Sequence, residues 1–98
     1  MTTHYELHGV SFEWDNDKAT TNRHKHLVDF EAACEVFLDP FLRPADAGEE
    51  SDELRQAVLG LTTTWALLLV VYVERGDTLR IISARPVTSA ERNRYEDL

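Results

Sequence analysis

The pattern of apolar and polar side chains predicts a strand near the start of the chain, and helix-capping residues predict two helices after it. Residues 10–14 alternate with a period of two, which is typical of a half-buried strand. Asp15 can cap a polar helix over residues 18–26, because its short side chain accepts hydrogen bonds from the amides of the first turn. Asp29 can cap a second helix, which ends before Pro40 because the residue preceding a proline avoids the helical region. We expect one buried apolar face on this second helix, made by Phe30, Ala33, Cys34 and Phe37.

The second half of the chain predicts a meander of strands. A loop over residues 41–52, with room for a short edge strand at residues 41–43, precedes a strand over residues 54–61. The three threonines that follow can form either a turn or part of a strand. The longest apolar run, residues 65–73, is rich in β-branched side chains and predicts a central strand. A turn that contains glycine then leads to a last strand over residues 79–85.

A capping box predicts a short helix near the end of the sequence. Thr88 and Glu91 have the spacing at which each side chain caps the other's backbone amide, and the helix should cover residues 89–97. A helix this short must dock on the rest of the protein to be stable. We find neither a repeat nor a long linker and predict one domain over residues 1–98. Its class is α+β, with a mainly antiparallel sheet of about four strands, two N-terminal helices and a short C-terminal helix.

Composition excludes several classes of protein. The single cysteine, Cys34, cannot form an internal disulfide. Residues 1–10 lack the basic and apolar regions of a signal peptide. The longest apolar run has nine residues, whereas a membrane helix needs about 20. We therefore expect a cytoplasmic protein that does not enter a membrane.

The charge distribution is uneven and favours one kind of ligand. The net charge of −8 opposes simple electrostatic binding of nucleic acid. Residues 31–55 are strongly acidic, but residues 75–94 hold five arginines against Asp77 and Glu91. A solvated mixed surface explains such an asymmetry in most proteins. A phosphate-binding role is the functional alternative, because the planar guanidinium group suits phosphate.

Strand geometry restricts how two of these arginines can act. In the predicted strand over residues 79–85, strict alternation puts Arg80 on one face and Arg85 on the other. The two can serve one site only if a β-bulge intervenes or if Arg85 turns away at the strand end. Metal binding finds little support, because His24 and His26 point to different faces of their helix. We expect neither a metal nor another cofactor.

The order and spacing of several motifs resemble the BrnT-type ribonuclease toxins of bacterial toxin–antitoxin pairs. The N-terminal part of this resemblance is Phe12-Glu13-Trp14-Asp15-x-x-Lys18-x-x-x-Asn22-x-x-Lys25-His26-x-Val28-x-Phe30-Glu31-x-Ala33, followed by Val36-Phe37-x-Asp39-Pro40. The C-terminal part is Leu69-Val70-Val71-x-x-x-Glu74-Arg75, then Arg80-Ile81-Ile82-Ser83-Ala84-Arg85, then Glu91-Arg92-x-x-Tyr95-Glu96. Together these motifs span nearly the whole chain.

The resemblance implies a RelE-like fold, ribonuclease activity and neutralisation by a cognate antitoxin. This antitoxin is a BrnA-like ribbon-helix-helix protein, and operator DNA is contacted only through it. A ribonuclease that uses no metal needs a base, cations that stabilise the developing negative charge, and an acid. Our catalytic candidates are Arg80 and Arg85 as the cations, with His26 and Glu74 as acid and base. The candidates for binding the RNA substrate are Arg55, Arg75 and Tyr95.

Each candidate also has a structural interpretation. His26 can stabilise the end of its helix through the helix dipole, and an arginine is more often an ion-pair partner than a catalytic group. Pro86 stands where the resembled family usually has a basic residue. The acidic net charge and Pro86 favour an alternative function, in which a catalytically degenerate toxin-like protein acts as a partner-binding or co-repressor scaffold.

Overall fold

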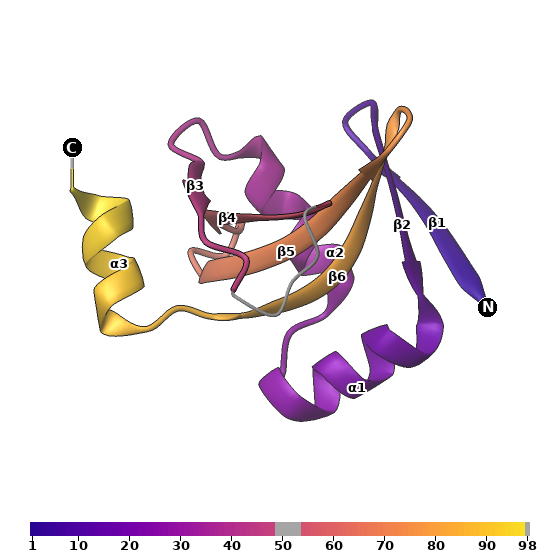
Figure 1. Ribbon diagram of the computed structural model, residues 1–98, viewed down its shortest axis with the longest axis horizontal. Helices are drawn as coiled ribbons and strands as arrows, with labels where there is room; N and C mark the ends of the chain where they lie inside the picture. Colours follow the sequence, from indigo (N-terminus) through magenta and orange to yellow (C-terminus); the bar gives the residue numbers. More distant parts are fainter. Residues whose placement is uncertain (49–53, 98) are drawn as a thin grey trace.

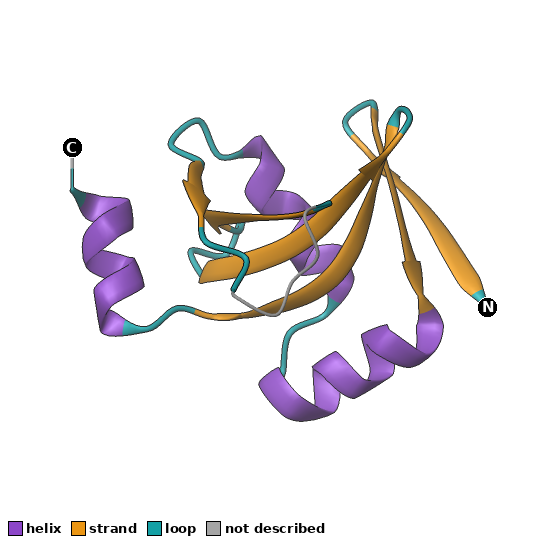
Figure 2. Cartoon of the chain, viewed as in Figure 1, coloured by secondary structure: helices purple, strands orange, loops and turns teal. Residues whose placement is uncertain are grey.

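The computed structural model describes residues 1–48 and 54–97, in which one mixed sheet is accompanied by three α-helices (Figures 1 and 2). In chain order the elements are β1 (Thr2–Leu7), β2 (Val10–Asp15), α1 (Asn16–His26), α2 (Phe30–Glu35), the 3₁₀ turn η1 (Val36–Leu38), β3 (Arg43–Ala45), β4 (Arg55–Leu61), β5 (Leu67–Arg75), β6 (Thr78–Pro86) and α3 (Ser89–Glu96). Within the described residues, no helix is both long and apolar enough to cross a membrane.

The sheet has six strands in the order β1-β2-β6-β5-β4-β3, so β5 and β6 are the central pair. The α+β class, the mainly antiparallel pairing and the central position of the long apolar strand are confirmed. The expected number of about four strands is wrong. The pair β2 and β6 is parallel, and the chain begins with a strand hairpin, so α1 and α2 are not N-terminal elements.

Strand β1 escaped prediction because only two of its side chains, Tyr5 and Leu7, are large and apolar. They nevertheless pack on the core, and the strand pairs along its whole length with β2. The hairpin turn is His8-Gly9, and both residues have positive φ angles, 48° and 80°. Such two-residue turns match the twist of paired strands and normally require glycine or a short polar residue. Histidine at the first position hides this signal.

Two apolar clusters lie on opposite faces of the sheet. The first, which we call the α2 face, is covered by α2 and contains the edge-to-face pair Trp14 and Phe30, whose ring centroids are 5.8 Å apart. The opposite face carries a smaller cluster on β4 and β5 made by Ala57, Leu59, Leu69 and Val71. Parts of the chain that pack on this second cluster include Ala45, Ala47, Ile82, Val87 and Tyr95.

Several predicted bounds need correction. The strand expected from Trp65 begins at Leu67, because Trp65 has a φ angle of 68° in a turn and is 81% exposed. The preceding threonines belong to that turn rather than to a strand. The short edge strand lies at residues 43–45 instead of 41–43. The predicted loop over residues 41–52 lies partly outside the described residues.

The apolar side of helix α2 is largely buried, as predicted. Phe30, Ala33 and Cys34 are buried, as are Leu69 and Val71 on the sheet. Phe37 is the exception, because it is only partly buried and packs at the border of the cluster, where its ring meets Phe12 and Tyr72.

Replacing Phe30 with alanine should therefore destabilise the fold strongly. Phe30 is 1% exposed, so Phe30→Ala should lower the free energy of unfolding by about 3–5 kcal/mol in chemical denaturation. Phe37→Ala should cost clearly less, because part of its ring already meets solvent. Leu27→Ala is the control, since Leu27 is 88% exposed and should change stability little. A larger loss for Phe37→Ala than for Phe30→Ala would contradict this description of the core.

Candidate functional site between helix α1 and strand β6

A β-bulge in β6 brings the two central arginines to one face. In the register of β5 with β6, Val71 pairs with Ser83 and Tyr72 with Ile81, which leaves Ile82 without a partner. The extra residue inverts the alternation after it. The strict alternation that separates Arg80 from Arg85 is therefore wrong for this strand. The β-bulge, which the sequence analysis gave as the condition for a shared site, is present.

Register partners show which face this is. Arg80, Ser83 and Arg85 pair with Val73, Val71 and Leu69, which alternate along β5 and lie on the face opposite α2. Arg55 pairs with Val73 from the other side, and Arg75 follows Val73 by two residues. Four of the predicted arginines therefore share one face of the sheet: Arg55, Arg75, Arg80 and Arg85.

Glu13 on β2 holds two of these arginines. Its carboxylate oxygen Oε2 accepts a hydrogen bond from Arg80 at 2.7 Å and lies 3.6 Å from Arg75. The side chains of Arg80 and Glu13 are only 20% and 14% exposed. A half-buried pair of this kind fixes the direction of the guanidinium group more firmly than a surface ion pair does.

Glu91 holds the third arginine through a two-pronged contact. Both Glu91 carboxylate oxygens accept hydrogen bonds of 2.8 Å from Arg85, while the same carboxylate completes the capping box of α3 with Thr88. The hydrogen bonds from Arg85 lower the pKa of Glu91 to about 2 and raise the pKa of Arg85. The C-terminal helix is thus attached to the sheet through an arginine.

Helix α1 runs beside β6 where β2 has ended (Figure 1). Strand β2 pairs with β6 only as far as Arg80. Beyond that point Asn22 of α1, which is 6% exposed, takes the place of a strand partner for Ala84. Its side-chain amide donates to the Ala84 carbonyl at 2.9 Å, and its side-chain oxygen accepts from the Ala84 amide at 3.1 Å. A third hydrogen bond, to the Val28 carbonyl at 3.1 Å, fixes the chain after α1.

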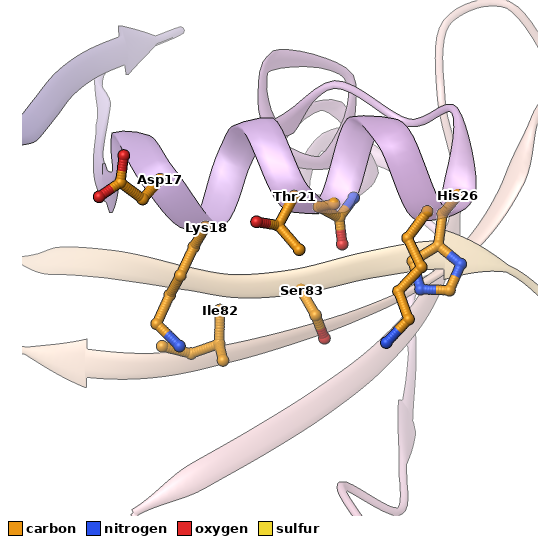
Figure 3. A pocket seen from close by; sticks show the side chains of 8 residues that line it. Asp17, Lys18, Thr21, His26, Ile82 and Ser83 are labelled. Atoms are coloured by element: carbon orange, nitrogen blue, oxygen red, sulfur yellow. The ribbon is translucent and has the colours of Figure 1, made fainter.

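A pocket of about 300 Å³ lies between α1 and the bulge. Its helix side and its strand side are shown in Figure 3, where Ile82 and Ser83 lie below the helix. His26, the predicted acid or base, is at one end of the pocket and is partly exposed. The residues that line it are Asp17, Lys18, Thr21, Asn22, Lys25, His26, Ile82 and Ser83.

The remaining predicted site residues lie elsewhere. Glu74 pairs with Leu79 and so projects from the α2 face, away from the four arginines. The Tyr95 hydroxyl donates a short hydrogen bond to Asp39, and burial together with this bond raises the pKa of Tyr95 to about 12. Cys34 is buried and its pKa is raised by desolvation, so its thiol is unreactive. Among residues 1–48 and 54–97, no group of three His, Cys, Asp or Glu side chains could hold a metal ion.

Sequence reasoning missed the carboxylates and the lysines of this region. Glu13 and Glu91 stand in the quoted motifs, but only the register shows that they face arginines. Lys18 and Lys25 carried a usable signal, because a spacing of seven residues puts both on one side of a helix. The pocket joins residues from the two ends of the motif pattern.

Comparison with known proteins gives the class of this protein. Residues 14–91 match the family model described as the ribonuclease toxin BrnT of type II toxin–antitoxin systems. A crystal structure of the Brucella abortus ribonuclease toxin BrnT is similar, with 26% sequence identity and a TM-score of 0.62, over 78% of this chain and 94% of that one. No match was found among curated proteins. The fold and the match define a toxin of a type II toxin–antitoxin system, a class that implies an antitoxin partner.

The chain belongs to the BrnT family of ribonuclease toxins, as the resemblance of its motifs implies.

The Arg85–Glu91 contact predicts a specific pH dependence of stability. Because the pKa of Glu91 is lowered from its ordinary value of 4.5 to about 2, its contribution is complete above about pH 4.5 and is lost as the pH falls toward 2. Glu91→Gln should therefore lose stability at neutral pH and show a weaker decline of unfolding free energy between pH 4.5 and 2. Denaturation series at several pH values measure this decline. Parallel curves for the two proteins would mean that Glu91 is not held by Arg85.

Proposed function

We propose that this protein cleaves RNA without a metal, by attack of a ribose 2′-hydroxyl on the adjacent phosphodiester. One observation carries the proposal: the bulge at Ile82 leaves Arg80 and Arg85 on the same face as Ser83, beside the pocket that contains His26. A cleaved phosphodiester gathers negative charge in its transition state, so cations on one face with a titratable group beside them suit this chemistry.

In this proposal each group has a defined role. His26 takes the proton from the 2′-hydroxyl as general base. The 2′-oxygen bonds to phosphorus, the bond from phosphorus to the 5′-oxygen breaks to leave a 2′,3′-cyclic phosphate, and water protonates the departing 5′-oxygen. Arg80 and Arg85 stabilise the charge on the phosphate oxygens, and Arg75 and Arg55 bind neighbouring parts of the RNA from the same face. We leave Glu74 out, because its side chain projects from the α2 face. The Tyr95 hydroxyl anchors α3 through its hydrogen bond to Asp39, so we leave Tyr95 out of RNA binding.

The carboxylates support this role for the arginines. Arg80 uses one nitrogen for Glu13, and a guanidinium group has five N–H donors, so donors are left for a phosphate. Holding a cation in a fixed direction before the substrate arrives lowers the reorganisation that the reaction requires. Glu13 and Glu91 are therefore positioning residues.

Purified free protein should cleave single-stranded RNA, and the cleavage rate should respond to these side chains. His26→Ala should reduce the rate about 10²–10⁴-fold, as expected for loss of a general base. Arg80→Ala and Arg85→Ala should also reduce it strongly, with circular dichroism unchanged. Arg92→Ala is the matched control, because Arg92 is a 55% exposed arginine on α3 that pairs only loosely with Glu96, at 3.9 Å. Full activity in all three site variants would remove these residues from the mechanism.

A non-enzymatic scaffold is the second candidate function. One observation favours it: Glu13 and Glu91 neutralise both central arginines. If wild-type protein cleaves no RNA while it still binds an antitoxin, this second function holds and the first is wrong.

We also propose that the antitoxin is a BrnA-like ribbon-helix-helix protein, and that the pair acts in the cytoplasm. Type II membership calls for a protein antitoxin. An antitoxin bound over the arginine-bearing face would prevent RNA from reaching it. Such binding would also stabilise the folded toxin by mass action. DNA binding then belongs to the antitoxin, because phosphates repel a chain with a net charge of −8.

This chain alone should not bind double-stranded DNA at physiological salt. Because the DNA contacts of ribbon-helix-helix proteins come from their own strands, operator DNA should shift in a mobility-shift titration only when the antitoxin is present. Tight operator binding by the toxin alone would contradict this division of roles.

A further inference from the structure

We propose that the pocket between α1 and β6 is a phosphate-binding subsite for single-stranded RNA, in which Lys18 and Lys25 contact backbone phosphates above Ser83. The inference rests on the proposed function, because it names how the RNA substrate would be held. It concerns binding and can be tested without cleavage.

The first argument is the placement of the lysines. The chain has ten Lys and Arg residues, of which only Lys18 and Lys25 are lysines, and both line this one pocket. On a protein with a net charge of −8, two cations at one small pocket are a local exception.

The second argument is that these two cations are free. Arg23, Arg75, Arg80, Arg85 and Arg92 are each within ion-pair distance of a carboxylate. Among the described residues Arg43, Arg55 and Arg94 have no such pair, but none of these three lines this pocket. For the two lysines no such pair occurs within residues 1–48 and 54–97. Asp17 also lines the pocket, but Figure 3 shows its carboxylate at the start of the helix, directed away from the Lys18 ammonium group.

The third argument is geometry. Lys18 and Lys25 are seven residues apart, which puts them on one side of α1 and about 10 Å apart along the helix axis. In Figure 3 the Lys18 side chain reaches down toward Ile82 and the Ser83 hydroxyl lies along the same side of the helix. A phosphate in the pocket would therefore meet ammonium groups from α1 and a hydroxyl donor from β6.

The fourth argument is continuity with the arginines. Ser83 lies on the same face as Arg80 and Arg85, three residues after the first and two before the second. The subsite thus shares its pocket with His26, the proposed base, and lies beside Arg80 and Arg85. Arg80, Ser83 and Arg85 follow one another along the single strand β6, which suits contact with one strand of RNA. The negative charge on the rest of the protein opposes the binding of a duplex.

Binding of a non-cleavable RNA tests the inference directly. The probe is a fluorescent oligonucleotide whose 2′-hydroxyls are all methylated, and anisotropy measures its affinity for the full chain. The double variant Lys18→Ala/Lys25→Ala should bind at least tenfold more weakly at low salt. Its plot of log affinity against log salt should be shallower by about 1.4, because each lost contact to single-stranded nucleic acid removes about 0.7. Lys18→Arg/Lys25→Arg should keep most of the affinity.

Arg23→Ala is the matched control. Arg23 is also a cation of α1, but it is not part of the pocket and pairs with Asp29 at 3.4 Å. Chemical denaturation should show that both variants fold. If the double lysine variant and the Arg23 variant bind the probe alike, the subsite is wrong even where the wild type cleaves RNA. If the lysine variant loses affinity while the wild type cleaves nothing, the subsite stands and the proposed catalysis is wrong.

The source of the phosphate can be identified by NMR. Reductive ¹³C-methylation labels only Lys18, Lys25 and the N-terminal amine in this sequence. The 2′-O-methyl oligonucleotide should shift the ¹³C-methyl signals of both lysines. Inorganic phosphate at the same phosphate concentration should shift them much less. Equal shifts would overturn the assignment to RNA and make the pocket a site for free phosphate.

Discussion

The hydrogen bonds between Asn22 and Ala84 are the interaction on which the rest of this structure depends. Where β2 leaves β6, a central strand would otherwise expose a backbone amide and carbonyl inside the protein, and unpaired buried groups of this kind are costly. Asn22 supplies a donor and an acceptor from one side chain, at 2.9 and 3.1 Å. The same contact brings α1 against the bulge. The pocket is a consequence of this arrangement, whereas the shared face of Arg80 and Arg85 comes from the bulge itself.

The charges of the region fall into two groups with different physical roles. Arg80 and Arg85 are held by Glu13 and Glu91, so they have fixed directions but little net charge. The lysines on α1 have no ion-pair carboxylate among the described residues and keep their full charge. Fixed, neutralised arginines suit discrimination by geometry, whereas free lysines attract an anion over distance. On our proposal, an acidic protein would therefore bind RNA locally, without a basic surface.

Periodicity explains which parts of this fold could be predicted. Three elements have a strong signal in a short stretch of sequence, and all three are confirmed: the alternating strand at residues 10–14, the apolar helix face around Phe30 and the capped C-terminal helix. Strand β1 has only a weak alternation of apolar and polar residues. It becomes partly buried because it pairs with β2, and a short stretch of sequence does not show that pairing. The bulge at Ile82 has no local signal either, because it depends on the register with β5. Arg80 and Arg85 could be named as candidates from the sequence, but their shared face followed only from that register.

The dependence of the site on one side chain also links binding to folding. The pocket is formed by a helix and a strand that are joined by the two hydrogen bonds between Asn22 and Ala84. A ligand that bridges α1 and β6, whether RNA or an antitoxin segment, binds only the folded arrangement. At a thousandfold excess over its dissociation constant, such a ligand stabilises the fold by about 4 kcal/mol. For a domain of 98 residues this is a large fraction of the total stability. With either ligand bound, the protein is therefore expected to be more stable than the free chain.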